Sequence, residues 1–408
     1  MMFQWWREGD AKARRSLVAA SLGWMLDSFD VMLYALVVQG VMADLAIDAG
    51  MGGQLQSYTL FASAAGGLMF GVIADRFGRT RALILSVLMY SVFTAACGFA
   101  RTAAELAVFR VFLGIGMGGE WASGAALVSE TWPDRHRGKA LAFVQSSWAI
   151  GYGLAVIVDF VVRSVLGFNW RVVFFVGVAP ALFALWVRRK VEEPELWQQA
   201  RRERHSRSLA PMFGGRMLVV TVALTLMNAG TMFAWWGFNT WVPSYLTAAR
   251  EAGGVGLSEG IKASLILSSQ VGMWFGYVTF GYVADAVGRR RTYVGYLLLA
   301  AVFVWAYTST TNALVLLAIG PFTAFFATGH FSGFGAVSAE LYPTSIRATA
   351  QGLTYNIGRV ASAVAPWLVG GLADTAGYGS ALSVTALAYL VSASFWLFIP
   401  ETRGRTIS

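Results

Sequence analysis

The chain has 408 residues, of which 57% are hydrophobic and only 13% are charged. So few charges give too little polar surface for a soluble globular protein, and we therefore expect a multi-pass membrane protein. The formal net charge of +9 would suit a nucleic-acid-binding protein, but the positions of the basic residues argue against that class. A single cysteine excludes an internal disulfide.

Apolar segments of about 20 residues, the length that crosses ~30 Å of hydrocarbon, follow one another along the chain. We expect them at 17–42, 54–74, 80–100, 104–129, 140–162, 171–188, 216–246, 260–284, 292–310, 312–339, 350–373 and 379–399. The first run follows basic residues, as in a signal peptide, but it is long and carries acids, which indicates a retained helix. The prediction is an all-α membrane protein with 12 transmembrane helices: an N-terminal six-helix bundle (1–188), a charged cytoplasmic linker (189–215) and a C-terminal six-helix bundle (216–408).

The basic residues fix the expected orientation, because cytoplasmic loops carry an excess of Lys and Arg. With the N-terminus inside, 24 of the 31 Lys and Arg residues fall in cytoplasmic loops and tails, and five fall outside. Both termini are therefore predicted to be cytoplasmic. The same asymmetry explains the net charge without any nucleic-acid partner.

The two halves carry the same motifs. Residues 71–79 (GVIADRFGR) recur as 281–289 (GYVADAVGR), and the Glu-Pro-Arg pattern of 130–137 recurs at 340–347. Both pairs are 210 positions apart. Two independent motifs that keep one offset indicate a duplicated six-helix bundle with parallel repeats.

At these motifs the sequence resembles the major facilitator superfamily, over essentially its whole length. Residues 24–30 (WMLDSFD) and 116–121 (GMGGEW) are most similar to the sialate and carboxylate proton symporters, and 400–405 (PETRGR) is similar to the sugar porters and metabolite:proton symporters. The resemblance implies a small-molecule transporter in the lipid bilayer, with protons as co-substrate. We expect it to work as a monomer without a cofactor, and we expect no enzyme activity, because no set of nucleophile, base and orienting group is evident.

The first expected helix carries two carboxylates, Asp27 and Asp30, which share one helix face. A charge at the centre of a bilayer costs about 3 kcal/mol on insertion scales, so such acids are usually functional or paired. The resemblance implies that Asp30 and Arg110 correspond to the acid and the arginine of the proton-coupling pair in proton-coupled sugar porters. Asp27 has no counterpart in those proteins. Glu120 is a further candidate, since the 210 offset maps it onto another titratable residue. The alternative for each acid is a purely structural role.

Arg359 is expected near the bilayer midplane, where its planar guanidinium suits bidentate recognition of a carboxylate. The alternative is a salt bridge to Asp27 or Glu120. The other candidates for substrate contact are Gln145, Tyr152, Asn239, Gln270, Trp274, His330 and Asn356. Lipid-facing belts or packing are the alternative for the aromatic residues and His330. No metal site is predicted, because Glu120 and His330 have no further metal-ligating side chains beside them in the sequence.

Charged residues of the repeated motifs lie at expected helix ends beside tight glycine turns. The resemblance implies that they form cytoplasmic networks that break when the inner gate opens; plain surface charge is the alternative. They are Asp75, Arg79, Glu130, Arg137, Asp285, Arg289, Glu340 and Arg347.

Together these features predict a proton-coupled symporter of a cell membrane that imports a small organic acid by alternating access. A neutral sugar or polyol porter, or an exporter, is the alternative within the class. The glutamine pair typical of sugar porters is missing from the seventh expected helix, which weakens the neutral-sugar alternative. A non-transporting receptor on the same fold is the alternative from another class.

Overall fold

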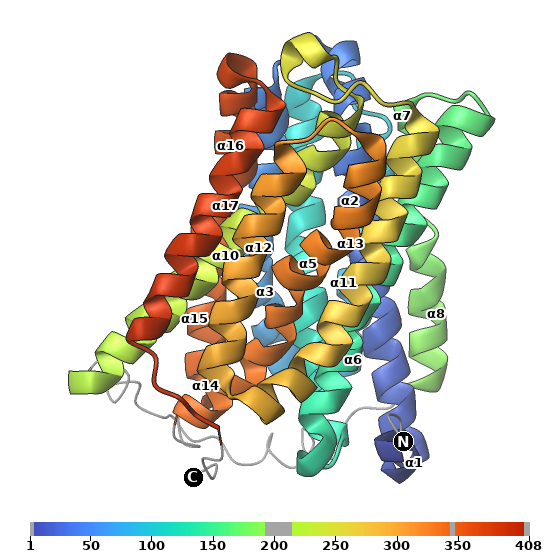
Figure 1. The fold of residues 1–408 in the computed structure, drawn as a ribbon. Helices are drawn as coiled ribbons and strands as arrows, with labels where there is room; N and C mark the ends of the chain where they lie inside the picture. The colour runs from blue at the N-terminus through green and yellow to red at the C-terminus, as the bar shows by residue number, and fades with distance from the viewer. Residues whose placement is uncertain (1–3, 192–213, 343–346, 404–408) are drawn as a thin grey trace. The chain divides into compact units, whose positions relative to one another are not determined.

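The structure is a computed structural model that describes residues 4–191, 214–342 and 347–403. All regular elements in that part of the chain are helices (Figure 1). The α-helices of the first half are α1 (Gln4–Glu8), α2 (Ala11–Leu45), α3 (Ala49–Phe77), α4 (Arg79–Cys97), α5 (Ala103–Thr131), α6 (Asp134–Asp159), α7 (Trp170–Val176) and α8 (Pro180–Lys190). Those of the second half are α10 (Gly215–Thr247), α11 (Glu259–Val287), α12 (Arg289–Thr308), α13 (Ala313–Gly329), α14 (Phe334–Leu341), α15 (Arg347–Ser362), α16 (Ala365–Ala376) and α17 (Tyr378–Ser394).

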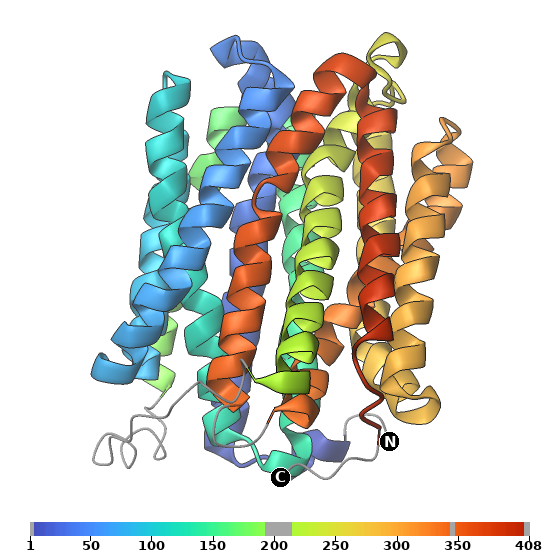
Figure 2. The ribbon, with the colours of Figure 1, turned by 90° about the vertical axis from the view of Figure 1, so that its left-hand side faces the viewer.

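Each expected apolar segment falls on a helix or on a helix with a short break. In the described part of the chain, eight helices are long and apolar enough to cross a membrane. The sixth and eleventh expected segments are interrupted where α8 begins at Pro180 and α16 begins beside Pro366, as Figure 2 shows for α15 and α16. Proline lacks the N–H that a continuous helix needs, and its ring clashes with the preceding turn. A count of 12 spans therefore stays a prediction.

A one-residue turn joins α3 to α4 and another joins α11 to α12. The turn residues, Gly78 and Gly288, have φ angles of 117° and 112°. A side chain at such an angle would be strained, so glycine is required at both positions. These glycines lie 210 positions apart, so the repeated motif reproduces the same turn in both halves.

Close backbone contacts between helices are repeated as well. A Cβ added at Gly66 of α3 would overlap the carbonyl oxygen of Ile115 on α5, and a Cβ added at Gly276 of α11 would lie 2.5 Å from that of Phe325 on α13. Small residues allow helix backbones to approach in this way inside a membrane. Because both members of each contact keep the 210 offset, the halves share a packing arrangement as well as motifs.

The chain divides into two compact units, one of Met1–Val41 with Tyr58–His205 and one of Met42–Ser57 with Ser206–Ser408. The start of α3, up to Ser57, belongs to the second unit. There the carboxylate of Asp374 on α16 accepts hydrogen bonds from the backbone N–H groups of Ala49 (3.1 Å) and Gly50 (2.8 Å), a favourable place for a negative charge. Most of the expected linker lies outside the described residues, so the bundle boundaries at 188 and 216 stay predictions.

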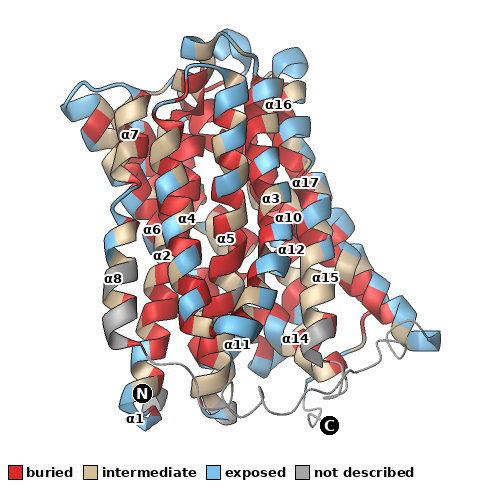
Figure 3. Ribbon diagram, turned by 180° about the vertical axis from the view of Figure 1, so that it is seen from behind, coloured by how far each residue is buried: buried red, intermediate tan, exposed pale blue. Residues whose placement is uncertain are grey.

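Large apolar side chains are exposed on one side of many helices, while the other side is buried (Figure 3). Leu68, Val92 and Leu182 of the first unit and Val302 and Leu314 of the second are among the exposed ones. A soluble protein rarely exposes apolar surface on this scale. The pattern suits helices whose outer sides contact lipid.

The N-terminal segment is attached to the loop between α5 and α6. The indole N–H of Trp132 donates to the carbonyl of Ala13 at 2.9 Å, and the rings of Trp6 and Trp132 lie 6.4 Å apart. Glu8 and His136 approach to 2.9 Å. The repeated Glu-Pro-Arg motif spans this loop, so the N-terminal segment packs against a repeated motif of its own unit.

Candidate substrate and coupling site

Asp27 and Asp30 are both buried on α2. The sequence places both acids within an apolar run of membrane-spanning length, and their burial agrees with that expectation. The hydroxyl of Thr94 on α4 donates to Oδ2 of Asp30 at 3.3 Å. Among the described residues, Oδ1 of Asp30 has no hydrogen-bond partner. A buried carboxylate that is only half satisfied is a costly feature, and such features are common at functional sites.

Arg110 lies fully buried on α5, and its guanidinium carbon is 3.7 Å from the ring centroid of Tyr34. Tyr34 is one helical turn after Asp30 on α2, so the arginine meets α2 one turn from the acid. A cation over an aromatic face is stabilised by the ring's negative charge density. Asp30 thus contacts Thr94 and Arg110 contacts Tyr34, and a direct Asp30–Arg110 pair stays a prediction.

Tyr90 joins this region although sequence reasoning did not select it. It lies one turn before Thr94 on α4, is completely buried, and its hydroxyl has no hydrogen-bond partner among the described residues. Thr94, on the same side of α4, is the residue that donates to Asp30. A signal was present in the sequence, because polar residues recur at helical spacing on this apolar helix: Ser86, Tyr90, Ser91 and Thr94.

Glu120 is buried on α5 against Gly23 of α2, where a Cβ would collide with its Oε1. The ring of the next residue, Trp121, packs against Trp24 of α2 at a tilt of 45°, with the ring centroids 4.6 Å apart, and the ring of Trp24 lies 4.8 Å from that of Trp148 on α6. Helices α2, α5 and α6 therefore meet at three tryptophans beside a buried acid.

Two further candidates of the first unit, Gln145 and Tyr152, are buried on α6. The amide oxygen of Gln145 has no hydrogen-bond partner among the described residues. One turn along, Ser28 of α2 donates to the backbone carbonyl of Trp148 at 2.8 Å. These contacts place the expected polar face of α6 against α2, which carries Asp27 and Asp30.

Arg359 is only 4% exposed on α15. Its backbone carbonyl accepts from Ser362, but the described residues contain no recorded acidic partner for its guanidinium. One turn away on the same helix, the backbone carbonyl of Tyr355 accepts from Asn228 of α10 at 3.4 Å, and Asn356 donates to the carbonyl of Gly352. The expected polar face of the eleventh segment is therefore packed against α10, with a buried positive charge on it.

The other amide candidates of the second unit donate to their own helices. Asn239 donates to the carbonyl of Trp235 at 3.0 Å, and Gln270 donates to that of Ile266 at 3.2 Å. The amide oxygen of Gln270 is buried and has no partner among the described residues. Trp274 is half-buried on the same helix, with its ring against Phe275.

His330 occupies a break in the tenth expected segment, where the short 3-10 helix His330–Gly333 separates α13 from α14. Its ring lies 4.4 Å from that of Phe331, and the hydroxyl of Tyr293 donates to its backbone carbonyl at 2.8 Å. Nε2 of His330 is buried without a hydrogen-bond partner among the described residues. The break is held by side-chain hydroxyls, since Ser332 also donates to the carbonyl of Tyr277.

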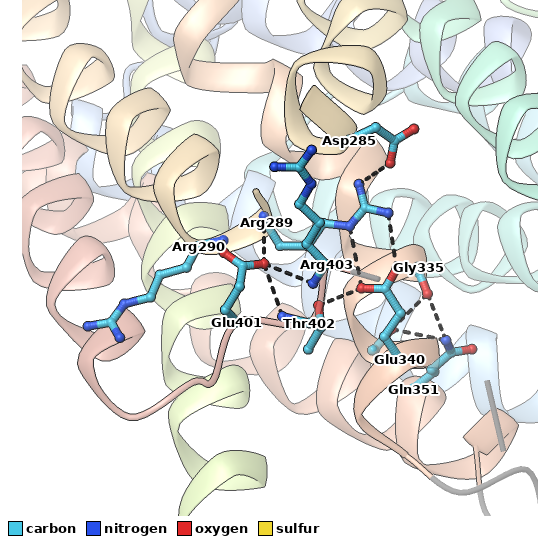
Figure 4. A network of polar contacts seen from close by, with 10 residues as sticks. Asp285, Arg289, Arg290, Gly335, Glu340, Gln351, Glu401, Thr402 and Arg403 are labelled. Carbon is cyan, nitrogen blue, oxygen red and sulfur yellow. Dashed lines mark hydrogen bonds and ion pairs between the residues drawn. The ribbon is translucent and has the colours of Figure 1, made fainter. Parts of the chain in front are cut away.

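The charged motif residues form one ion-pair network in each unit. In the first, Nε and Nη2 of Arg79 lie 3.0 and 2.9 Å from one carboxylate oxygen of Glu130. In the second, Arg289 binds Glu340 through the same two nitrogens and binds Asp285 through the third (Figure 4). Arg137 is half-buried in the first unit. The side chains of Asp75 and Arg347 lie outside the described residues.

Glu401 extends the second network, and sequence reasoning gave it no role. Its carboxylate accepts hydrogen bonds from the backbone N–H groups of Arg289, Arg290, Thr402 and Arg403, at 2.8 to 3.1 Å (Figure 4). Partial burial acts to raise the pKa of this carboxyl, but the four N–H donors outweigh it, so the pKa lies below its usual value. The segment after α17 is thereby fixed to the start of α12.

Comparison with known proteins decides what kind of protein carries these sites. The sequence model of the Major Facilitator Superfamily matches residues 20–260 and 251–408. The chain belongs to this superfamily. Its helices are therefore those of a multi-pass membrane protein with the major facilitator fold, as the repeated motifs predicted.

Relatives within the superfamily are named as metabolite transporters. A protein of Cupriavidus pinatubonensis named "Probable 4-methylmuconolactone transporter" is 32% identical, and the match covers 100% of this chain and 95% of that protein. The cis,cis-muconate transport protein of Acinetobacter baylyi is 29% identical over 94% of both chains. The crystal structure of a D-xylose-proton symporter superposes with a TM-score of 0.79 at 20% identity, over 97% of this chain and all of that one, which shows a shared fold.

Proposed function

We propose that this superfamily member is a proton-coupled symporter that imports a small organic acid by alternating access. The observation that carries the proposal is Arg359, a buried guanidinium with no recorded acidic partner among the described residues. An uncompensated buried charge costs several kcal/mol, whereas two parallel hydrogen bonds to a carboxylate offset that cost. The natural ligand of such a group is an organic anion. The relatives named for muconate and methylmuconolactone transport support the same class.

The proposed proton site is Asp30, with Asp27, Glu120 and Arg110 around it. Asp30 is held by one hydroxyl rather than by a full shell of donors, so its charge state can respond to its surroundings. Arg110 lies one turn away over Tyr34, where a small rearrangement brings it into reach of Asp30. Formation and loss of that pair would tie proton binding to the transport cycle.

The proposal includes the topology expected from sequence. Twelve helices cross the cell membrane, both termini are cytoplasmic, and the Arg79 and Arg289 networks close the cytoplasmic side. Arg137, Glu130, Asp285 and Glu340 belong to these networks. The expected contacts of the substrate are Arg359 with the amides Gln145, Asn239, Gln270 and Asn356, and the side chains of Tyr152, Trp274 and His330.

Transport by purified protein in proteoliposomes tests the function. We expect carboxylates to accumulate against their gradient when an inward proton gradient is imposed, and neutral sugars to show no uptake. Collapse of the gradient with an ionophore should reduce uptake to equilibration. Accumulation of neutral sugars would favour a sugar porter, efflux driven by the same gradient would favour an exporter, and binding without flux would favour a receptor.

A further inference from the structure

The three tryptophans of the first unit differ in exposure. Trp24 and Trp148 are buried, with 3% and 4% of their surface exposed, whereas Trp121 is only half-buried. Trp24 contacts both of the others, so it forms the base of the cluster. Trp121 is therefore the ring of the three that is partly accessible to another molecule.

The accessible surface of Trp121 is not on the outer side of α5. Phe112 marks that side, because 41% of its surface is exposed. Trp121 follows nine residues later, about two and a half helical turns, and so lies on the opposite side of the helix. It also lies well inside a 29-residue helix, away from the ends where tryptophans anchor helices at membrane interfaces.

The second unit repeats this arrangement. Phe331, 210 positions after Trp121, is half-buried, and its ring lies 6.5 Å from that of Trp235 on α10. Trp236 packs on Trp235 at 4.9 Å. Phe322, nine residues before Phe331, is 55% exposed. In both units, a half-buried aromatic residue follows a buried titratable residue and packs on a buried tryptophan of the first long helix.

Two polar atoms near the first cluster have no hydrogen-bond partner in the part of the chain that the structure describes. The indole N–H of Trp24 is buried and makes no hydrogen bond to any described residue. The amide oxygen of Gln145, one turn from Trp148, is also buried and accepts no hydrogen bond from any described residue. An indole N–H can only donate, so its natural partner is an acceptor such as a carboxylate oxygen. The cluster thus combines an accessible flat ring with a donor for an anion.

We infer that Trp121 is a specificity-determining residue that selects planar, conjugated carboxylates over saturated ones. A conjugated acid presents a flat π face that stacks on the indole, and Trp24 supports that ring and donates to the ligand. A saturated acid of the same length and charge is puckered or flexible, so it loses the stacking contact while it keeps the charge interactions. This inference rests on the proposed function, because it names the class of acid that the transporter takes.

Two pairs of ligands isolate this effect: cis,cis-muconate with adipate, and benzoate with cyclohexanecarboxylate. Each pair matches in charge and carbon count and differs in conjugation. Calorimetric titration of the purified protein should show about two- to tenfold tighter binding of each conjugated acid, the range that an aromatic contact supplies. Trp121→Leu should reduce both ratios to about one, and Trp121→Phe, which keeps a flat ring, should retain most of the preference.

Phe112→Leu is the matched control, since it removes an aromatic ring from the outer side of the same helix, and it should leave both ratios unchanged. Melting temperatures establish that each variant is folded. If the wild-type protein binds both members of each pair equally, or if Trp121→Leu weakens all four acids by one common factor, the inference fails while carboxylate transport stands. If none of the four acids binds, the inference fails, and carboxylate accumulation in proteoliposomes decides the proposed function separately.

Discussion

Two nitrogens of Arg79 donate hydrogen bonds to the same carboxylate oxygen of Glu130. Both side chains are largely buried, with 15% of the surface of Arg79 and 21% of that of Glu130 exposed. The partner residues lie 51 positions apart, and the pair Arg289–Glu340 repeats that spacing in the second unit. A charge-assisted contact of this kind contributes about 1.5–3 kcal/mol. It is therefore strong enough to hold two helix ends together and weak enough to break during a transport cycle.

The first prediction concerns this pair. Arg79→Gln and Glu130→Gln should each lower the melting temperature and the initial rate of uptake, and the double variant should be no worse than the poorer single one. A double-mutant cycle should give a coupling of about 1–3 kcal/mol. Arg76→Gln, which alters an exposed arginine on the same turn, is the control and should behave like the wild type. Fully additive effects would show that the two residues act independently.

The second prediction concerns Arg359. Arg359→Lys keeps the charge but loses the planar fork, so the KM for the best carboxylate should rise about ten- to a hundredfold, with little change in melting temperature. Concentration-dependent uptake measures this. Arg250→Lys, an exposed arginine in a short loop helix, is the control. An unchanged KM would remove Arg359 from the substrate site.

The third prediction concerns Asp30. Asp30→Asn is almost isosteric with the protonated acid, so it should abolish accumulation driven by a proton gradient and yet leave substrate exchange measurable. Thr94→Val, which removes the recorded donor to Oδ2, should weaken coupling without abolishing it. Counterflow and gradient-driven uptake in the same proteoliposomes separate the two activities. Should Asp30→Asn still accumulate substrate while Asp27→Asn or Glu120→Gln does not, the proton site lies with those residues.

The fourth prediction is a pH dependence of stability from Glu401. Because the pKa of Glu401 is lower in the folded protein than its ordinary value of 4.5, the stability it adds is fully present above that value. The added stability is lost as the pH falls through the lowered pKa. Glu401→Gln should therefore lower the melting temperature at pH 7, and the difference from the wild type should shrink below about pH 4.

Glu251→Gln is the control for this experiment, because Glu251 is an exposed carboxylate outside the network. Melting curves of the three proteins between pH 7 and pH 3.5 make the comparison. A difference between Glu401→Gln and the wild type that persists at the lowest pH would assign the effect to packing of the side chain and not to its charge.

The fifth prediction compares two glycines of α3. A Cβ at Gly66 would overlap the backbone of Ile115, whereas a Cβ at Gly71 would meet nothing within 4 Å. Gly66→Ala should therefore destabilise the protein by about 1–3 kcal/mol. Gly71→Ala should be neutral or stabilising by up to about 1 kcal/mol, since alanine favours helix. Equal melting temperatures for the two variants would contradict the close approach of α3 and α5.

The sequence predicted the elements of this fold well, because membrane helices are marked by long apolar runs and the 210 offset exposed the repeat before any coordinates. Buried acids on α2 and a buried Arg359 followed from the same patterns. These features depend on local sequence or occur in both halves, so they can be predicted from the order of residues alone.

Contacts between different helices were harder to predict. That Thr94 contacts Asp30 depends on the rotation of α4 about its axis, which no local motif encodes. The role of Glu401 depends on where the chain turns after α17, and the packing of Trp24 against Trp121 depends on the approach of α2 to α5. Helix lengths alone also gave no sign of the 3-10 break at His330.

The attachment of the N-terminal segment has a consequence for the order of events during synthesis. The hydrogen bond from Trp132 to the carbonyl of Ala13 joins residues 119 positions apart. At a translation rate of ~5–20 residues per second, Trp132 emerges about 6–24 s after Ala13 has left the ribosome. During that interval the first helix is inserted without its anchor, and the start of the chain is free for the ribosome-bound insertion machinery until α5 is complete.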